Sequence, residues 1–407
     1  MVVVSRRPQV ELTDNAPRGI EVFWTLGGEV DGEFPWHPSR RWRRDPEHVR
    51  LTALALDRLP FSGALMAIGQ PGHLDPWMIA ASVAPLTKRI RFLIAAYPGV
   101  TSPTELALKA LTLDALSNGR LMLNVVGSNP VTMAAHGIHI SKVDRYALLD
   151  EYWHTFKSLY GGTPLRPGRF YNIDEPGRFL AVEPTQVPGP PLWGAGESPE
   201  GKATVVSFVD VFLPKAGTPQ EIAARTNEAT QLAAARGRRA LRFACSMGVL
   251  VRETEDEAWA EADRQLRHTS LDAITGTQSW AAASSADPAS LTDRERRCVE
   301  AVRAGHLPDA RDLEFYPNIW TGPKDRAGID FMRMGPVPHT MLIGSAEQVA
   351  ERMREIQALA GVDRFILWAP PFTEEAYRVA DLLLPLLPLG DEAAHLSLHL
   401  RDLTDPA

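Results

Sequence analysis

Short apolar runs alternate with helix-like patterns along almost the whole chain, and this alternation constrains the fold more than any other feature. It is typical of parallel strands joined by helical crossovers. Because the runs are rich in Val, Ile and Leu, the strands are predicted to be buried on both faces, as in a parallel sheet covered by helices. Eight strands are predicted in this way, at residues 20–26, 63–67, 90–96, 121–126, 191–196, 210–214, 243–253 and 364–369.

Helix patterns between these runs supply the crossovers, for example at 103–117, 145–161 and 218–237. Eight strand–helix units predict an α/β fold of the TIM (β/α)8 barrel type. Barrels of this kind can absorb 407 residues as one domain. We therefore expect a single domain over 1–407, with its core at about 18–390 and a peripheral tail at 391–407.

More than a hundred residues separate the last two predicted strands, far more than one crossover helix needs. We expect this long insertion before the last strand to carry lid and oligomer surfaces, at about 269–340. Within it, 269–305 looks helical and weakly packed, whereas 321–339 is punctuated by Gly and Pro and predicts a mobile loop. Ser345 and Gln348 then have capping-box spacing, which predicts a helix start.

Composition excludes several classes of partner. The formal charge is −7, from 43 basic and 50 acidic residues. Because these charges are mixed along the chain, the sequence predicts no basic patch for nucleic acid or for an anionic membrane. No apolar run approaches the length of a membrane span. Two cysteines cannot form a disulfide framework, and Cys245 is predicted to be a small buried residue. We expect a soluble protein of the cytoplasm.

The segment LTLDALSNGRLMLNVVGSNP at 111–130 turns polar at the end of a predicted strand. TIM barrels build their active sites at the carboxyl ends of the strands. Asn124 and the polar residues that follow it are therefore candidates to meet a ligand, although a plain polar turn between strand and helix would look the same.

The run at 100–130, followed by RYALLDEYWHTFKSLY at 145–160, resembles the bacterial luciferase-like flavin-dependent monooxygenases, above all their alkanesulfonate and pyrimidine monooxygenase branch. Segments at 75–99, 192–201, 317–322 and 374–387 carry the same resemblance in the same order.

The resemblance implies an enzyme that uses O2 and reduced FMN. The FMN would come from a separate NAD(P)H:flavin reductase, and a flavin peroxide would insert one oxygen atom into a small organosulfur or nitrogen-containing substrate. We also expect a homodimer or homotetramer.

By the same resemblance, Asn124 meets the flavin ring and Ile68 lies near it. Arg145 and Tyr146 hold the phosphate and ribityl region, and Ser198 meets the phosphate. The physical chemistry agrees, because a guanidinium is a fixed fork of donors for phosphate and a helix N-terminus adds partial positive charge.

The sequence departs from the branch at its catalytic groups. The Arg and His of the seventh strand correspond to Ser246 and Gly248, and the catalytic tyrosine corresponds to Pro370. These replacements remove much of the apparatus for a sulfonate, so short alkanesulfonates are not expected to be good substrates. His73 and Arg333 are left as candidates for catalytic roles, with a surface-loop position as the alternative for His73.

Tryptophans at or near strand ends are predicted to line a substrate pocket for a flat or bulky organic molecule. They are Trp24, Trp193, Trp320 and Trp368. Packing against the flavin or in the core is the alternative interpretation. Histidine pairs at 136/139 and 395/399 have no carboxylate or cysteine nearby in the sequence, so no metal site is predicted.

Two other functions stay open. One is a deazaflavin (F420)-dependent oxidoreductase of the same superfamily, which would need no oxygen. The other is a non-catalytic flavin-binding protein, which the missing catalytic groups would suit.

Overall fold

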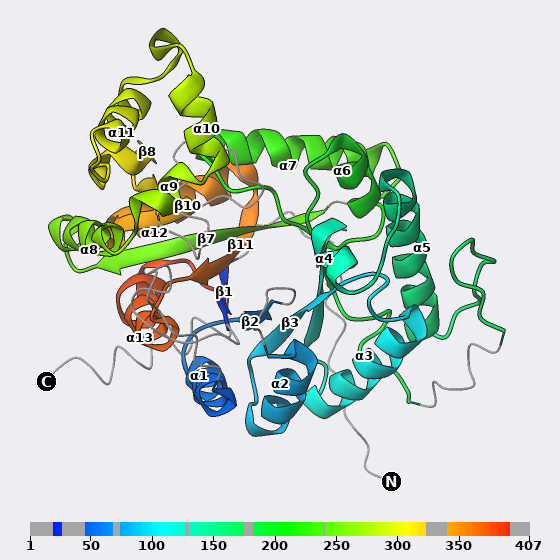
Figure 1. The fold of residues 1–407 in the computed structure, drawn as a ribbon. Coiled ribbons are helices and arrows are strands. Elements are labelled where there is room, and N and C mark those ends of the chain that lie inside the picture. Colours follow the sequence, from blue (N-terminus) through cyan, green and yellow to red (C-terminus); the bar gives the residue numbers. More distant parts are fainter. Residues whose placement is uncertain are drawn as a thin grey trace, which may run out of the picture.

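The computed structural model describes residues 19–26, 45–67, 74–126, 130–174, 182–238, 241–322 and 340–390. Eight parallel strands close into a barrel, because the order β11-β1-β2-β3-β4-β5-β6-β7 is completed by the pairing of β11 with β7. Helices surround the barrel (Figure 1), so the predicted α/β TIM barrel is confirmed. The barrel strands are β1 (Glu21–Thr25), β2 (Gly63–Met66), β3 (Arg91–Ala96), β4 (Leu121–Val125), β5 (Leu192–Gly194), β6 (Val211–Phe212), β7 (Arg242–Arg252) and β11 (Val362–Trp368).

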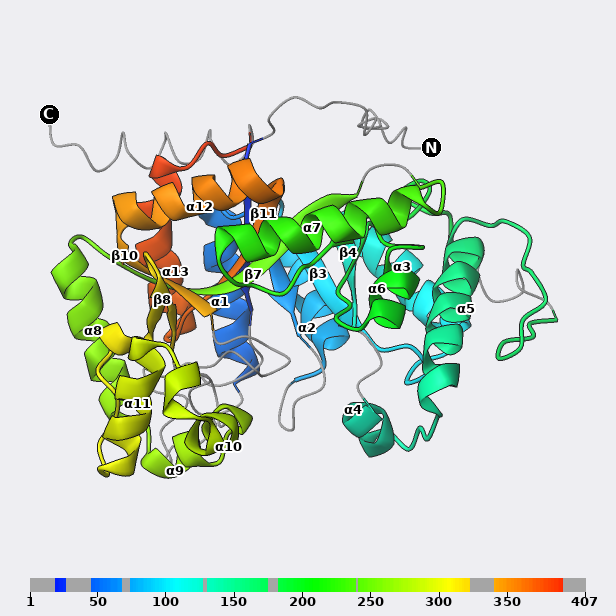
Figure 2. The same cartoon turned by 90° about the horizontal axis from the view of Figure 1, so that it is seen from above.

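The helices that follow these strands form the outer layer, which Figure 2 shows from above. They are α1 (Pro46–Arg58), α2 (Pro76–Val83), α3 (Pro103–Ser117), α4 (Pro130–Ala135), α5 (Lys142–Tyr160), α6 (Pro199–Val205), α7 (Pro219–Ala234), α12 (Ala346–Ala360) and α13 (Phe372–Arg378). Short 3-10 turns at Ala84–Leu86 and Leu384–Leu386 and a π-turn at Val379–Leu383 extend α2 and α13.

Local sequence signals fix the helix ends. α3 begins after Ser102, whose Oγ accepts a hydrogen bond from the Glu105 N–H at 3.1 Å, and it ends at Asn118 in the left-handed region. The predicted capping box of α12 is present, because the side chains of Ser345 and Gln348 bond each other's backbone N–H groups.

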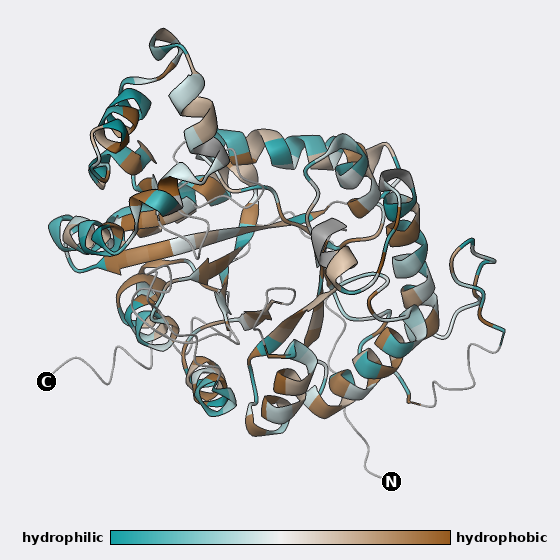
Figure 3. Cartoon of the chain, in the orientation of Figure 1, coloured by the Kyte–Doolittle hydropathy of each residue, from teal (hydrophilic) through white to brown (hydrophobic). Residues whose placement is uncertain are grey.

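Two apolar cores follow from the alternation of side chains along the strands. Residues that face outward, such as Trp24, Phe92 and Leu123, pack against the helices. Residues that face inward, such as Phe23 and Met122, fill the barrel. Figure 3 agrees, with mostly hydrophobic barrel strands and hydrophilic residues on the outside of the helices.

The insertion before the last strand forms a further layer to one side of the barrel, away from α5 in both views (Figures 1 and 2). The first half of β7 pairs with β11 and its second half pairs with β10. Three strands, which the sequence analysis did not predict, thereby extend the sheet outside the barrel: β8 (Glu314–Tyr316), β9 (Ile319–Thr321) and β10 (Thr340–Ser345). The insertion's helices are α8 (Glu255–Arg267), α9 (Leu271–Thr275), α10 (Gln278–Ser285) and α11 (Asp293–Arg303), with 3-10 turns at Pro288–Ser290 and Arg311–Leu313.

The expectation that 269–305 is helical is confirmed, but the expectation of weak packing is wrong. Ile274, Ala283, Cys298 and Val299 are buried in a third apolar core together with Trp259 of α8. This core covers the face of the strands that extend beyond the barrel. The expected mobile loop at 321–339 lies almost wholly outside the described residues.

Both cysteines are buried and unpaired, and burial raises the pKa of Cys245 to about 12. This confirms the interpretation of Cys245 as a small core residue. None of the helices in the described ranges combines the length and apolar character needed to span a membrane.

Candidate active site

Asn124 lies at the carboxyl end of β4 and faces the barrel interior. It is paired in register with Ala95 of β3 and Trp193 of β5, and it has the same side-chain direction as Met122 of the inner core. Its side chain is half-buried, in contrast to the fully buried residues below it. An amide with both donor and acceptor atoms therefore stands at the mouth of the barrel.

The barrel is closed below this mouth by an aromatic floor. Trp193 packs edge-on against Phe23, with 4.8 Å between ring centroids, and both are fully buried. The guanidinium of Arg364 lies 5.7 Å from the Trp193 ring. Trp193 is thus part of the packed barrel floor, which agrees with the alternative interpretation that the tryptophan packs in the core and does not line a substrate pocket.

Charged side chains gather at the amino ends of the strands, beneath that floor: Arg364 is buried, and Glu21 and Arg91 are half-buried. Glu21 forms ion pairs with Arg91 at 2.6 Å and with Arg364 at 2.8 Å. Burial lowers the pKa of Arg364 to about 10, while burial acts to raise the pKa of Glu21 and the two arginines together hold it below the ordinary value of 4.5. The charged network therefore seals the end of the barrel opposite to Asn124.

A hydrogen bond joins the first turns of two helices beside the mouth. The hydroxyls of Tyr146 on α5 and Ser198 at the start of α6 are 2.7 Å apart. Ser198 Oγ also accepts the Gly201 N–H at 3.0 Å and caps α6. The structure thus brings together two residues that lie 52 positions apart and that the sequence analysis assigned to one phosphate site.

A small residue keeps this hydroxyl pair open. A Cβ at Gly201 would lie 3.1 Å from Ser198 Oγ and 3.4 Å from the Tyr146 ring. Both hydroxyl-bearing residues are half-buried. Two half-buried hydroxyls near the amino end of the 19-residue α5 fit the donors that a phosphate group needs.

Arg145 adjoins this pair and is half-buried on α5. Arg145 directly precedes Tyr146 in α5, so the two residues lie at nearly the same level of this helix. On the same helix, Asp144 pairs with Arg169 at 2.7 Å, and Glu151 accepts the backbone N–H groups of residues 169–171.

The glycines at 194 and 196 have an explanation within the chain. A Cβ at Gly194 would lie 2.9 Å from Val209, and one at Gly196 would lie 2.7 Å from the backbone of Gly201. These glycines allow the turn after β5 to pack against α6, so their presence is not itself a sign of a ligand.

The β7 side of the mouth is an apolar wall. Gly248 is paired in register with Trp368 of β11 on one side and with Met341 of β10 on the other. A Cβ at Gly248 would lie 2.5 Å from Met341 Cγ and 3.0 Å from Trp368 Cζ2. Met341 thus fills the space that a histidine would take at this position. Sequence reasoning missed Met341, although the apolar run MLI before the Ser345 cap was a signal for its strand.

The remaining tryptophans have different surroundings. Trp368 is half-buried at the end of β11, on the inward face. Trp24 faces the helices, where its Nε1 donates to the carbonyl of Phe372 at 3.0 Å. Trp320 is buried beside Met341, its register partner on β10, with its ring 6.1 Å from that of Trp259. Trp24 and Trp320 therefore pack cores, and Trp368 borders the mouth.

Three candidates from the sequence, Ile68, His73 and Arg333, lie outside the described residues. Among the residues that are described, no group of three His, Cys, Asp or Glu side chains is arranged to hold a metal ion.

Comparisons with known proteins identify the family of the chain. The family description "Luciferase-like monooxygenase" matches residues 29–364, well over half of the chain. The chain therefore belongs to the luciferase-like monooxygenase family, which is a family of flavin-dependent monooxygenases, and the predicted family and enzyme class are confirmed.

Solved structures share the fold at low sequence identity. EDTA monooxygenase from Chelativorans sp. BNC1 is 18% identical over 91% of this chain and 93% of its own, with a TM-score of 0.67. The oxygenating constituent of 3,6-diketocamphane monooxygenase from Pseudomonas putida, in complex with FMN, is 16% identical over 90% and 98%, with a TM-score of 0.60. The F420-dependent tetrahydromethanopterin reductase from Methanopyrus kandleri is 14% identical over 91% and 99%, with a TM-score of 0.61.

Proposed function

We propose that the protein is the oxygenase of a two-component system. It would take reduced FMN from a separate NAD(P)H:flavin reductase and transfer one oxygen atom from O2 to a small organosulfur or nitrogen-containing substrate. The observation that carries this proposal is the hydroxyl pair of Tyr146 and Ser198, 2.7 Å apart, together with Asn124, which faces inward at the carboxyl end of β4. This set offers donors for a phosphate and an amide for a polar ring, which are the two ends of FMN.

The chain's own residues would hold and orient the cofactor. Arg145, Tyr146 and Ser198 would bind the phosphate and ribityl region, and Asn124 would bind the edge of the ring. Ile68 is proposed to lie near the ring by resemblance alone. Reduced FMN, when bound, supplies the two electrons with which O2 is activated.

The substrate would lie against the apolar wall formed by Gly248, Met341 and Trp368. Ser246, which also faces inward and is half-buried, supplies a neutral hydroxyl at this wall. A wall of this composition excludes water from the reacting atoms and suits an uncharged part of the substrate. Catalytic proton transfer is proposed for His73 or Arg333, the remaining candidates.

An anaerobic titration followed by exposure to isotope-labelled O2 tests the proposal. We expect reduced FMN to bind tightly and a product to gain one labelled oxygen atom by mass spectrometry. The fold shared with an F420-dependent reductase motivates a parallel titration with reduced F420. Tight binding of F420 with no response to reduced FMN would replace the proposal, and FMN binding without an oxygenated product from a substrate panel would favour a non-catalytic flavin protein.

The proposed setting is a homodimer or homotetramer in the cytoplasm, with one domain over 1–407 whose insertion carries the lid. Light scattering after size-exclusion chromatography tests the assembly. A pull-down with the host's NAD(P)H:flavin reductases tests the partner.

A further inference from the structure

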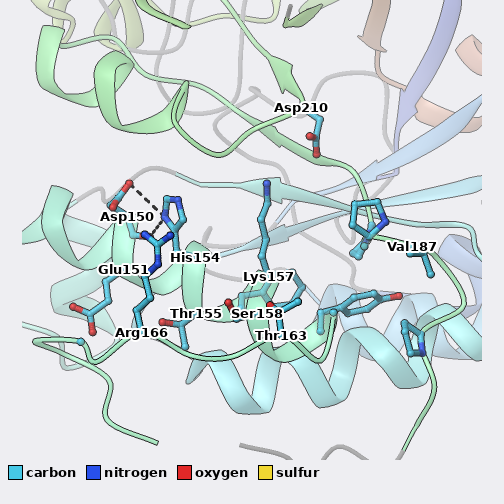
Figure 4. Close-up of a pocket in the computed structure, with 18 of the residues that line it drawn as sticks. Asp150, Glu151, His154, Thr155, Lys157, Ser158, Thr163, Arg166, Val187 and Asp210 are labelled. Carbon is cyan, nitrogen blue, oxygen red and sulfur yellow. Dashed lines mark hydrogen bonds and ion pairs between the residues drawn. The ribbon is translucent and has the colours of Figure 1, made fainter. Parts of the chain in front are cut away.

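A cavity of about 790 Å3 lies on the outer side of α5, away from the barrel mouth. It is bounded by the carboxyl-terminal half of α5, by Asp210 just before β6, and by the proline-rich segment at 184–190 (Figure 4). Because Asp210 precedes β6 and α5 ends at Tyr160, this cavity lies towards the amino ends of the strands. Nothing in the proposed oxygenation uses it.

The acidic side chains that line the cavity are occupied by the chain itself. Asp150 accepts a hydrogen bond from Ser207 Oγ at 2.9 Å and lies 3.6 Å from the His154 ring nitrogen. Glu151 accepts three backbone N–H groups, and Asp210 accepts the Leu192 N–H at 2.8 Å. These carboxylates have structural roles that hold the walls of the cavity in place.

Two cations that line the cavity, Lys157 and Arg166, form no ion pair within 4.0 Å to a carboxylate in the described part of the chain. Lys157 extends from α5 into the cavity (Figure 4) and donates to the Phe208 carbonyl at 2.6 Å. Burial lowers the pKa of Lys157, while Asp210 acts to raise it and Arg238 to lower it further. An ammonium that is half-buried with donors to spare is costly unless an anion approaches it.

The remaining walls are partly apolar, with polar side chains such as Thr155, Ser158 and Thr163 among them. Phe156, Pro184, Val187 and Pro188 line the cavity, and its volume is within the usual range for sites of small organic ligands. An apolar body would lie against these walls while its charged end reached the lysine and arginine.

From this arrangement we propose that the cavity is a second ligand site, which binds a small organic anion with a carboxylate or phosphate head group at Lys157 and Arg166. The site is separate from the proposed cofactor site. Tyr146 and Lys157 are 11 residues apart on α5, which corresponds to roughly 16 Å along a helix.

A matched pair of fluorescent probes tests the proposal. Anilinonaphthalenesulfonate is an aromatic anion, and phenylnaphthylamine carries the same rings without the charge. With saturating FMN present to fill the barrel, we expect the anionic probe to bind at least about tenfold more tightly than the neutral one, as for a charge-assisted contact. Lys157→Met and Arg166→Ala are each expected to remove most of this preference. Arg58→Ala, which removes an exposed charge on α1, is expected to leave it unchanged.

Because Arg166 is exposed, its alanine variant tests the site even where Lys157→Met fails to fold. Equal binding of the two probes, or an anion preference that survives Arg166→Ala, would overturn the proposal. Benzoate, phenyl phosphate and the neutral benzamide then compete with the anionic probe to assign the head group. Displacement by benzoate alone indicates a carboxylate, and displacement by phenyl phosphate alone indicates a phosphate. Displacement by benzamide to the same extent contradicts an anion site.

Discussion

Replacing Ser198 by alanine separates the two roles that the structure gives this hydroxyl. Its Oγ caps α6 through the Gly201 N–H at 3.0 Å and bonds the Tyr146 hydroxyl at 2.7 Å. Loss of an N-cap costs about 1 kcal/mol of the free energy of unfolding, and loss of a neutral hydrogen bond costs about as much again. We expect Ser198→Ala to lower the free energy of unfolding by roughly 1–2.5 kcal/mol in urea denaturation.

Ser198→Ala is also expected to weaken FMN binding, by more than the loss of folding stability would explain. A hydroxyl that donates to a phosphate contributes about 1.5–3 kcal/mol, so the affinity for FMN should fall about tenfold to a hundredfold. Flavin fluorescence titrations measure this change. Thr292→Ala is the matched control, because Thr292 caps α11 in the insertion in the same way and is expected to cost stability without changing FMN affinity.

Adding Tyr146→Phe completes a double-mutant cycle with Ser198→Ala. If the two hydroxyls act as one unit on the phosphate, their effects on FMN affinity should be strongly non-additive. If Ser198→Ala and Thr292→Ala bind FMN equally well, the hydroxyl pair is only a helix cap, and the phosphate site must be sought elsewhere.

Four further outcomes are expected. Arg145→Ala should weaken FMN binding about tenfold to a hundredfold in the same titration without changing the melting temperature much, whereas Arg169→Ala should leave FMN affinity within about twofold. Short alkanesulfonates should release sulfite slowly or not at all with reduced FMN and O2; rapid release from octanesulfonate would contradict the neutral wall at β7. Glu375→Ala should lower the free energy of unfolding by about 1–3 kcal/mol, because half-buried Arg252 on β7 loses two hydrogen bonds and is left with a 3.8 Å ion pair to Glu261, while Glu374→Ala on the exposed side should change it by less than about 0.5 kcal/mol in urea denaturation. Burial holds the pKa of Lys157 in the folded protein below its ordinary value of 10.5. Between these two pKa values the unfolded chain binds more protons than the folded protein, so the free energy of unfolding of the wild type should rise with pH relative to that of Lys157→Met. Parallel pH profiles of the two proteins would contradict this.

The barrel could be predicted because its signals are local. Each barrel strand is a short apolar run, and helices such as α3 are bounded by a Ser–Pro start and an Asn–Gly end. The predicted bounds of α3, 103–117, agree with Pro103–Ser117. α5 begins three residues earlier than predicted, because Ser141 caps it through the Asp144 N–H. That cap was readable in the sequence, and it shows that helix starts follow caps more closely than apolar periodicity.

The additional strands were harder to predict because tertiary pairing creates them. β8 and β9 have three residues each, and β10 joins the sheet only because β7 extends beyond its pairing with β11. The apolar wall depends on the same pairing, since Met341 lies over Gly248 across two strands that are far apart in sequence. A glycine in a strand signals a close neighbour, but the sequence does not say which residue approaches it.

The cavity on α5 was not predictable for a related reason. The sequence of its outer wall has no periodic pattern, and long-range hydrogen bonds hold this wall in place. Gln186 donates to the Asp114 carboxylate on α3, and the backbone N–H groups of residues 169–171 donate to the Glu151 carboxylate. Burial raises the pKa of Asp114, against hydrogen bonds from Tyr160 and Gln186 that lower it. Contacts of this kind become visible only when the segment at 182–190 is placed against the helices.

The distribution of charge along the barrel axis bears on where a cofactor phosphate can bind. Arg364 and its partners lie at the amino ends of the strands, beneath Trp193, and so do not reach the mouth. Among the described residues that face inward at the upper ends of β4, β7 and β11, Asn124, Ser246, Gly248 and Trp368 carry no charge. A dianionic phosphate would gain little inside such a mouth and would lose its hydration there. The proposed phosphate site at the Tyr146–Ser198 hydroxyl pair, near the amino end of α5, avoids this cost and would leave the neutral interior to the ring and the substrate.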